Sequence, residues 1–599
     1  MLQDLRYGLR QLRRNPGFTA AAVVTLALGI AVNTIIFSAV NGFMLRRPRI
    51  QDPASVVVIV SVDPAKGPEW GWDRKPVSAF DFVAWREQSS AFEDMVASDW
   101  SDFALTEHGE PERLVGMRAS AKYFDVLGVS AALGRTFLPD EDQPGHGQVV
   151  ILSYGLWQRR FGSNPKVIGE VVRLDGESYT VVGVMPRDYR LGVYGPQLWA
   201  PLVFAAENLS PAAREKRSLE VLARLKSGVS VETAKAEMAE LAQRSEQAYP
   251  GTSKGWSAAA MSIQHYIADE FRNGMRLQMG VVLFVLLIAC VNIASLQLTR
   301  GAERQREFAV RVALGASRFR LVRQLLVESL LIALAGGALG LLFASWGVDL
   351  FRRGLSSSPD VISIAHEVTI DHTVLIFTLG ISVFAAILFG LAPALHQTAV
   401  DLHSTLKEGG RASSQSRARH RTQSVLVTAQ IALSLVLLIG AGVFIQEFLD
   451  KVHDGFGIDP DQVLTANISL SSTRYNDPTK QAAFFHRAIE RLEALSGVIS
   501  AGATSTLVPG EYVRIVTFSI EGQPAMSRTE RERTDYFAIS ADYLRTLRIP
   551  LIRGRYFLPS DSTQAPPVAL VNQAFVRRYF PNEEPVGKRI RLDTSGSDR

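Results

Sequence analysis

Residues 18–45 read FTAAAVVTLALGIAVNTIIFSAVNGFML, which is 28 residues without an Asp, Glu, Lys or Arg. An α-helix needs about 20 such residues to cross the hydrocarbon core of a bilayer. The apolar region of a signal peptide is shorter, at about 7 to 15 residues, so this run is expected to be retained as a membrane span. Four further charge-free runs of 20 to 25 residues lie at 277–299, 329–348, 373–395 and 422–446. The sequence therefore predicts an integral membrane protein with five transmembrane helices.

The basic residues are placed as in a membrane protein and not as in a nucleic-acid-binding protein. The chain has 599 residues, of which 47% are hydrophobic and 21% charged, and a net charge of +5. Sixteen Lys or Arg residues lie in the segments 1–17, 300–323 and 396–421, against two in 349–372. Because basic residues concentrate on the cytoplasmic side, the amphipathic helix at 1–17, the loop at 300–328 and the linker at 396–421 are expected inside. The segment 349–372 is then a short outer loop, and the RRPR stretch at 46–49 is an exception to the rule.

Two large exterior parts remain, at 46–276 and 447–599, and both show the patterns of mixed α/β domains. Strands are predicted from β-branched or alternating apolar residues at 55–62, 149–153 and 218–225. The stretch VVRLDGESYTVVGVMP at 171–186 predicts a hairpin with Asp175 and Gly176 at its turn. Helices are predicted at 78–96, at 154–162 and at 229–247, the last with Ser230 as its cap.

One stretch of the first exterior part is repeated in the second. RASAKYFDVLGVSAALGRTFLP at 118–139 corresponds to AISADYLRTLRIPLIRGRYFLP at 538–559, with nine identities in the 20 positions 120–139 at an offset of 420. Each exterior part also follows a long apolar run, which indicates a duplicated unit of span plus exterior domain. The second unit stops just after the counterpart of Asp175. We therefore expect an incomplete second domain of marginal stability whose last strand is an exposed sheet edge.

The segment RGAERQREFAVRVALGASRFRLVRQLLVESLLIALAGGALG at 300–340 resembles the loop between the second and third spans of MacB/FtsX-type ABC transporter permeases. The layout is similar too, with one span, a large exterior domain and three further spans. LFGLAPAL at 388–395, DLHSTLKEGGR at 401–411 and VLVTAQIALSLVLLIGAGVF at 425–444 resemble the acidobacterial duplicated orphan permeases. The resemblance implies an α-helical protein of the bacterial inner membrane with two mixed α/β, MacB-like periplasmic domains. It also implies a separate cytoplasmic ABC ATPase as partner.

The loop at 300–328 is the candidate coupling site. Phe308, Val312, Ala316 and Phe319 recur about one helical turn apart with arginines around the rest of the circumference, as in an amphipathic helix. Such a helix can lie on the inner leaflet with its arginines among anionic headgroups. Alternatively, as the resemblance implies, its charged face docks the ATPase and passes force to the third span, with a bend at Gly315. The candidate coupling residues are Arg306, Glu307, Arg311, Gly315, Ala316 and Arg318.

No motif for catalysis or for a cofactor occurs in the sequence. The phosphate-binding pattern GxxxxGK[ST] is absent, so ATP hydrolysis is assigned to a separate subunit. Ser153 and Ser505 lack a GxSxG context, and neither exterior part contains HExxH. The single cysteine, Cys290, excludes a disulfide within the chain. We therefore predict no catalytic residue, no cofactor and no enzymatic activity.

Acidic residues at two places could nevertheless bind an ion or a proton. Asp140, Glu141, Asp142 and His146 form a cluster that could hold a metal. The repeat keeps only Asp561 at the corresponding place, which favours a solvated loop and no metal site. Glu328, at the inner edge of the third span, is interpreted as hydrated and not as a functional intramembrane acid.

The predicted function is that of a permease subunit for export or efflux, which transmits ATP-driven motion to its exterior domains. The alternative is an FtsX-like transmembrane scaffold that regulates an extracytoplasmic cell-wall hydrolase. A membrane-anchored enzyme would need an active-site constellation that the sequence does not show. Besides the ATPase, the expected partners are membrane lipid and a periplasmic adaptor or outer-membrane channel, and nucleic acid is not expected.

Overall fold

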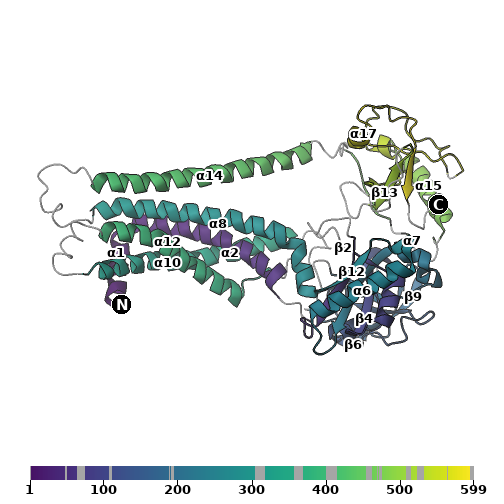
Figure 1. The fold of residues 1–599 in the computed structure, drawn as a ribbon, viewed down its shortest axis with the longest axis horizontal. Helices are drawn as coiled ribbons and strands as arrows, with labels where there is room; N and C mark the ends of the chain where they lie inside the picture. The colour runs from purple at the N-terminus through teal and green to yellow at the C-terminus, as the bar shows by residue number, and fades with distance from the viewer. Residues whose placement is uncertain are drawn as a thin grey trace, which may run out of the picture. The chain divides into compact units, whose positions relative to one another are not determined.

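In the computed structural model the chain forms two compact units (Figure 1). The structure describes residues 2–599 except 47–49, 64–73, 107–110, 188, 190–194, 304–316, 356–367, 399–414, 454–461, 469, 471–474, 476, 507–513, 523–531, 563 and 594–599. The first unit comprises Met1–Pro48, Leu191–Gly195 and Ile267–Gln446, and the second comprises Arg49–Arg190, Pro196–Tyr266 and Glu447–Arg599.

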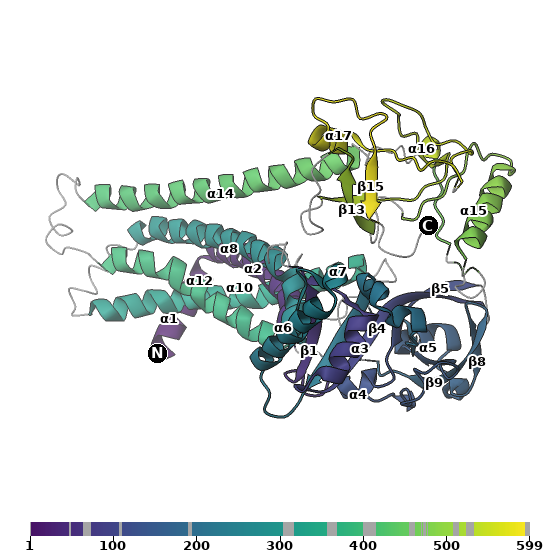
Figure 2. The same cartoon turned by 45° about the vertical axis from the view of Figure 1, so that its right-hand side comes forward.

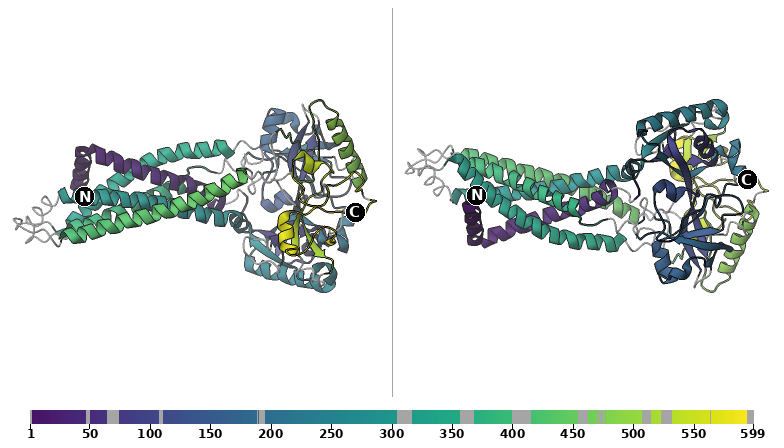
Figure 3. Two further views of the ribbon diagram at one scale, coloured as in Figure 1. Left: turned by 90° about the horizontal axis from the view of Figure 1, so that it is seen from above. Right: turned by 90° about the horizontal axis from the view of Figure 1, so that it is seen from below.

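The first unit consists of long helices (Figures 1 and 3). They are α1 (Leu2–Arg14), α2 (Pro16–Val40) with its π-helical continuation η1 (Asn41–Leu45), α8 (Ile263–Glu303), α10 (Arg318–Leu355), α12 (His372–Thr398) and α14 (Gln415–His453). Five stretches of the described residues are long and apolar enough to cross a membrane: Pro16–Val40, Gly274–Arg300, Phe319–Arg353, His372–Leu391 and Ser424–Asp450. They fall on the five charge-free runs of the sequence.

Small residues allow α10 to approach α2 closely. A Cβ atom added at Gly336 would lie 2.8 Å from Cβ of Leu26, and one added at Gly340 would lie 3.0 Å from the carbonyl oxygen of Ala27. The two glycines are four residues apart, which is the spacing that lets helix backbones pack tightly in a membrane. Larger side chains at these positions would force the two helices apart.

The first exterior domain is built on a 12-stranded sheet (Figure 2). The main path runs β12-β1-β11-β4-β5-β10-β7-β9-β6, and β2, β3 and β8 pair beside it. The bounds are β1 Val56–Val62, β2 Arg74–Lys75, β3 Val77–Ser78, β4 Phe92–Leu105, β5 Glu112–Ala119, β6 Leu133–Gly134, β7 Val149–Leu152, β8 Val171–Leu174, β9 Glu177–Val184, β10 Leu198–Pro201, β11 Arg217–Leu225 and β12 Ser257–Ser262. Most neighbours are antiparallel, but β5 with β10 and β7 with β9 are parallel.

Two apolar cores hold this sheet to its helices. At one end, α3 (Ala79–Gln88) and α6 (Val231–Ala248) contribute Phe82, Trp85 and Met238 to a core with residues of β1, β4 and β11. At the other end, α5 (Tyr154–Phe161) packs Leu156 against β7, β8 and β9. The domain therefore has two separate apolar cores, one against β1, β4 and β11 and one against β7, β8 and β9.

Local patterns predicted several of these elements correctly. The hairpin forms between β8 and β9 with Leu174 opposite Glu177. Its turn residues Asp175 and Gly176 have φ angles of 54° and 83°, as a tight hairpin turn requires. Ser230 caps α6 as predicted, because its side chain accepts a hydrogen bond from the Thr233 amide at 3.1 Å.

The prediction of one helix over 78–96 was wrong. The helix α3 ends at Gln88, and β4 begins at Phe92 as a central strand between β5 and β11. The helical conformation ends at Ser89 and Ser90. There Glu237 of α6 accepts hydrogen bonds from the Ser89 hydroxyl at 2.7 Å and the Ser90 amide at 2.6 Å. Glu237, which holds this turn, comes from a helix about 150 residues away, so the local apolar spacing could not indicate the contact.

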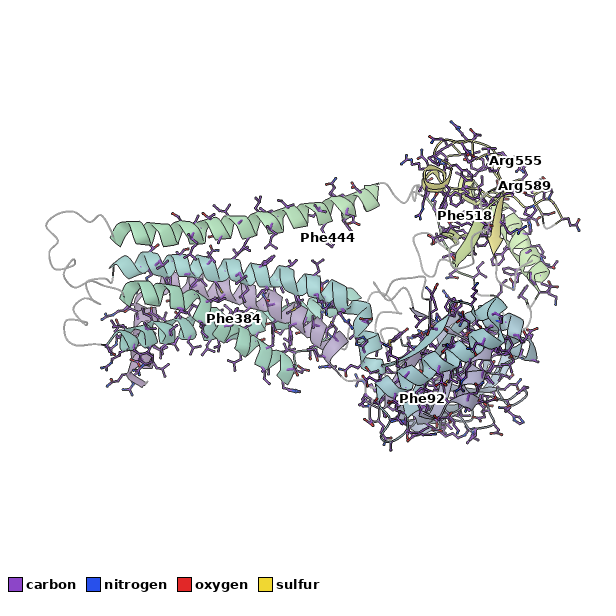
Figure 4. The ribbon with its side chains drawn as sticks, in the orientation of Figure 1. Phe92, Phe384, Phe444, Phe518, Arg555 and Arg589 are labelled. Atoms are coloured by element: carbon purple, nitrogen blue, oxygen red, sulfur yellow. The ribbon has the colours of Figure 1, made fainter. Side chains whose placement is uncertain are left out.

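The described part of the second exterior domain contains a three-stranded sheet in the order β14-β13-β15. Its elements are α15 Pro478–Glu493, β13 Arg514–Ile520, β14 Glu532–Tyr536, α16 Tyr543–Thr546, α17 Gln573–Tyr579 and β15 Ile590–Asp593. Phe518, labelled in Figure 4, is 3% exposed and packs with Ile520 and Phe580 in a small core. Aromatic contacts from Phe575 and Tyr579 complete this core.

The sequence repeat is also a repeat of structure. In the first domain Arg135 forms a two-pronged ion pair with Glu141, at 2.6 and 2.9 Å. In the second domain Arg555 (Figure 4) pairs in the same way with Asp561, at 2.7 and 2.9 Å. Glu141 also accepts from the Leu138 amide, and Asp561 accepts from Leu558, the residue 420 positions later. The loop is solvated at Asp140 and His146, whose side chains are 68% and 61% exposed, but Glu141 is 6% exposed and holds the segment that precedes it.

Candidate coupling site

The predicted coupling residues lie almost wholly outside the described residues. Arg306, Glu307, Arg311, Gly315 and Ala316 belong to the segment 304–316, and of Arg318 only the backbone is described. The structure does describe the two helices that flank this segment, α8 up to Glu303 and α10 from Arg318. Ser317 starts α10 by accepting a hydrogen bond from the Arg320 amide at its carbonyl oxygen, at 3.0 Å. From there α10 continues without a break into the span, as the sequence predicted.

The N-terminal helix α1 is attached to the start of α10. An oxygen of the Asp4 carboxylate lies 2.8 Å from an Nη atom of Arg323. One turn further along α1, Gly8 faces α10 so closely that an added Cβ would lie 2.9 Å from a methyl group of Leu331. A charge pair and a close backbone approach thus hold α1 against the stretch of α10 that follows the coupling segment.

Glu328 lies within this contact and is buried. Only 7% of the residue is exposed, and the Cβ position of Gly8 is 3.9 Å from the Glu328 Cα atom. The interpretation of Glu328 as a hydrated interfacial acid was therefore wrong. The sequence did not indicate that α1 packs over this stretch of α10, and that packing accounts for the burial.

Side chains of three more helices meet at the same end of the bundle. The guanidinium group of Arg300, near the end of α8, lies 4.2 Å from the ring centroid of Phe18 in α2. Gln297 of α8 donates a hydrogen bond to Ser329 of α10 at 3.3 Å. Ser329 in turn packs against Gly390 of α12, where a Cβ would lie 2.7 Å from the serine hydroxyl. At this end of the bundle α10 thus contacts α1, α8 and α12, so a displacement of α10 would also displace side chains of these helices.

Polar contacts join the helices further along the bundle. The Asn33 side chain of α2 donates to the carbonyl oxygen of Val282 in α8 at 2.8 Å. The hydroxyl oxygens of Thr34 and Thr378 are 3.1 Å apart, and the rings of Phe37 and Phe377 stack at 3.8 Å between centroids. Buried polar groups need such partners inside a membrane because no water is available to them. These contacts fix the register of α2 against α8 and α12.

The start of α12 is tied to Arg46, at the beginning of the basic stretch 46–49. Asp371 caps α12 by accepting from the Val374 amide at 3.0 Å, and it also pairs with Arg46 at 3.1 Å and accepts from Asn41 at 2.9 Å. Burial alone would raise the pKa of the Asp371 carboxyl, but these hydrogen bonds together lower that pKa below its usual value. Arg46, one of the basic residues of the exception at 46–49, is thus paired with a carboxylate in the structure.

Comparison with known proteins identifies the family to which this chain belongs. The family model described as the MacB-like periplasmic core domain matches residues 19–241 and again 424–597, and the model of the FtsX-like permease C-terminal region matches 279–401. The chain belongs to the MacB/FtsX family of ABC transporter permeases. It is therefore an inner-membrane protein with periplasmic MacB-like domains. The FtsX-like match begins within α8 and includes the whole of α10, the two helices that flank the coupling segment.

Individual relatives of the permease are distant. The chain is 26% identical over 284 residues to the probable syringafactin export ATP-binding/permease protein SyfD of Pseudomonas syringae, which is 47% of this chain and 40% of the relative. It is 26% identical over 290 residues to the macrolide export ATP-binding/permease protein MacB of Salmonella paratyphi A, which is 47% of this chain and 41% of that protein. The permease thus spans about two-fifths of the length of the curated relatives it matches.

Solved structures of periplasmic domains also match the permease. The periplasmic region of MacB from Actinobacillus actinomycetemcomitans is 16% identical, with a TM-score of 0.27 over 40% of this chain and 98% of that one. A domain of a putative permease from Porphyromonas gingivalis is 16% identical, with a TM-score of 0.28 over 36% of this chain and 92% of that one.

Sequence reasoning missed the residues that tie the helices of the permease together. An amphipathic helix before the first span was predicted, but its docking through Asp4 and Gly8 was not. A glycine and an acid on one such helix do not indicate which other helix they contact.

Among the described residues, no group of three or more His, Cys, Asp or Glu side chains could hold a metal ion.

Proposed function

We propose that this chain is the permease subunit of an ABC exporter and transmits motion from a separate cytoplasmic ATPase to its periplasmic domains. One observation supports this proposal most strongly. The helix that enters the coupling segment, α8, begins at Ile263, directly after the last residue of β12. It then runs 41 residues without a break, which is about 60 Å at 1.5 Å per residue. The single continuous helix α8 thus joins β12 of the exterior domain to the coupling segment along the chain.

The proposal assigns ATP hydrolysis to a separate subunit. The relatives are named ATP-binding/permease proteins, whereas this sequence contains no GxxxxGK[ST] phosphate-binding motif. In the proposal, the ATPase binds the charged face formed by Arg306, Glu307, Arg311 and Arg318, and Gly315 with Ala316 forms the bend before α10. The ties of α10 to α1, α8 and α12 then spread its displacement through the bundle.

Charge reversal tests the docking step. Arg311→Glu with Arg318→Glu should abolish the stimulation of ATP hydrolysis when the chain is reconstituted with the ATPase that copurifies with it. Arg352→Glu with Arg353→Glu, near the other end of α10, is the matched control and should leave the stimulation intact. Full stimulation by the first variant would refute docking through this face.

The proposed topology places the N-terminus and the segments 304–316 and 399–414 in the cytoplasm, with five spans. A cysteine introduced at Ser413 reports on it in a Cys290→Ala background, because Cys290 is the only native cysteine. The introduced cysteine should react with a membrane-impermeant thiol reagent in inverted vesicles and not in intact spheroplasts. Reaction in spheroplasts and not in inverted vesicles would show that this segment lies outside and that the proposed topology is wrong.

Export is favoured over the FtsX-like signalling role by the exterior domains. The MacB-like model matches the chain twice, and the first domain alone carries a 12-stranded sheet. Copurification decides between the two functions. An adaptor or outer-membrane channel would support export, and a cell-wall hydrolase would support signalling. We also propose that the chain has the duplicated arrangement of span and exterior domain found in the acidobacterial duplicated orphan permeases.

A further inference from the structure

The N-terminal helix α1 has a row of apolar side chains that the bundle covers at one end only. Leu5, Leu9 and Leu12 repeat at intervals of four and three residues, so they lie on one face of the helix. Leu12 packs against the apolar core shared by α2, α8, α10 and α12. Leu5 and Leu9 continue the row away from that core and are 39% and 49% exposed. An apolar surface thus extends from the interior of the bundle along α1.

A row of basic side chains lies beside this apolar row. Arg6, Arg10 and Arg13 have the same spacing one residue further along the helix, and all three are exposed. Within the part of the chain that the structure describes, none of the three forms an ion pair. The one acid of α1, Asp4, is paired with Arg323 of α10. The basic row therefore keeps its positive charge.

The corner between α1 and α2 sets the direction of these rows. Only Asn15 separates the two helices. Its side chain donates to the Gln11 carbonyl oxygen at 3.3 Å, and the Thr19 hydroxyl donates to the Leu12 carbonyl oxygen at 3.0 Å. The last carbonyl groups of α1 thus keep partners where the chain turns. In both views of Figure 3, α1 runs across the direction of α2. A helix that crosses the spans at their end lies along the membrane interface.

We propose that α1 is a binding site for anionic phospholipid at the inner face of the membrane. Leu5 and Leu9 enter the acyl-chain region, as the apolar face of an interfacial helix does. Arg6, Arg10 and Arg13 bind the phosphate groups of the headgroups. Zwitterionic lipid supplies the apolar environment but not the net negative charge that matches the basic row. The inference rests on the proposed topology only for the choice of the inner leaflet.

Lipid bound to α1 also acts on the start of α10. Asp4 pairs with Arg323, and Gly8 lies against Leu331, so α1 is held against the stretch of α10 that follows the coupling segment. A bound lipid that fixes α1 therefore steadies this stretch as well. Amide exchange at the start of α10 is for this reason a second readout of lipid binding.

Amide exchange of the full chain in nanodiscs tests the charge match. The chain, without its ATPase, is compared in phosphatidylcholine nanodiscs with and without added phosphatidylglycerol. With phosphatidylglycerol, exchange in residues 2–14 should slow by more than about fivefold, which is roughly what one arginine contributes at an anionic surface. Exchange in 317–323 should slow in parallel. No slowing in either segment would overturn the proposal.

Neutralised variants locate the site on the basic row. Arg6→Gln with Arg10→Gln should lose most of the slowing, although glutamine keeps the helix propensity of arginine. Arg352→Gln with Arg353→Gln, near the other end of α10, removes the same charge and should keep the slowing. Equal slowing in the two double variants would show that the basic row does not bind the lipid.

Quenching by brominated lipid tests the depth of the apolar row. In a Cys290→Ala background, a fluorophore is attached at Leu9→Cys or at Gln3→Cys, an exposed residue on the other side of α1. Bromine atoms in the acyl chains should quench the label at position 9 several-fold more than the label at position 3. Equal quenching would overturn insertion of the apolar row.

The ATPase is the competing occupant of this surface. Slowing of exchange in 2–14 by added ATPase in pure phosphatidylcholine, without any effect of phosphatidylglycerol, would overturn the proposal, because α1 would then bind the ATPase. The lipid experiments themselves contain no ATPase. Their failure would therefore leave the proposed export function untouched, and failure of ATPase docking would leave the lipid site untouched.

Discussion

Arg135 and Glu141, and their counterparts Arg555 and Asp561, show how much one residue pair contributes to each exterior domain. In both places the carboxylate binds a guanidinium group with two oxygens and also accepts from a backbone amide three residues earlier. Bidentate pairs of this kind have a fixed geometry and hold a loop in one conformation. The sequence contained these residues within the repeat but did not indicate that they pair, because the pairing depends on the fold of the intervening turn.

The second pair predicts a pH dependence. Hydrogen bonds from Arg555 and the Leu558 amide lower the pKa of Asp561 to about 2. An unpaired Asp titrates near 3.9, so the pair should stabilise the loop fully above about pH 4 and lose this effect as the pH falls towards 2. The loop 555–561 should therefore lose its protection against amide exchange only as the pH falls through this window. In Asp561→Asn it should already be fast at pH 7, and a variant as slow as the native chain would contradict the role of the pair.

Gly8 predicts a second effect at the residue scale. In an isolated helix Leu is favoured over Gly by up to about 1 kcal/mol, so Gly8→Leu should strengthen α1 itself. It should nevertheless detach α1 from α10, because the new side chain meets Leu331. Trypsin should then cut at Arg6 and Arg10 several-fold faster in inverted vesicles. Gly17→Leu, where a Cβ has no neighbour within 4 Å, is the control, and equal cleavage of both variants would show that α1 is not held at Gly8.

At the scale of elements, the contrast between two predictions shows what a sequence can reveal. The hairpin of β8 and β9 was predicted because its turn chemistry lies in the two residues Asp175 and Gly176. The prediction of a helix over 78–96 was wrong because α3 ends at Gln88, and the turn that follows is held by Glu237 from a distant helix. The five long apolar helices were visible as charge-free runs, whereas the contacts between α1 and α10 were not. Local chemistry is thus readable, and pairing between distant elements is not.

Packing of α10 against α2 gives the prediction at this scale. Gly340→Leu should lower the thermal stability of the bundle in detergent, by about 1–3 kcal/mol, because an overpacked interface must move apart. Gly380→Leu in α12, where a Cβ has no neighbour within 4 Å, should leave Tm unchanged. Thermal unfolding followed by circular dichroism measures both. Equal Tm values for the two variants would show that the close approach of α10 and α2 does not stabilise the bundle.

At the scale of the whole molecule, the family, the spans and the mixed α/β class of the exterior domains were predictable from the sequence. They depend on composition, periodicity and a repeat, which are properties of long stretches. The coupling residues themselves stay a prediction, because Arg306, Glu307, Arg311, Gly315 and Ala316 lie outside the described residues. The structure adds the mechanical context of these residues, namely two unbroken helices and the ties of α10 to α1, α8 and α12.

The central claim is that α8 carries motion from the coupling segment to the exterior sheet, and its stiffness can be removed selectively. Four glycines inserted after Tyr266 would interrupt α8 between β12 and the span, whereas four alanines would lengthen it and keep it helical. The measurement is the change in amide exchange of β12, residues 257–262, when a non-hydrolysable ATP analogue is added to the chain with its ATPase in nanodiscs. We expect the change to be lost with glycines and kept with alanines, while ATPase stimulation persists in both. An undiminished change in the glycine variant would contradict transmission through α8.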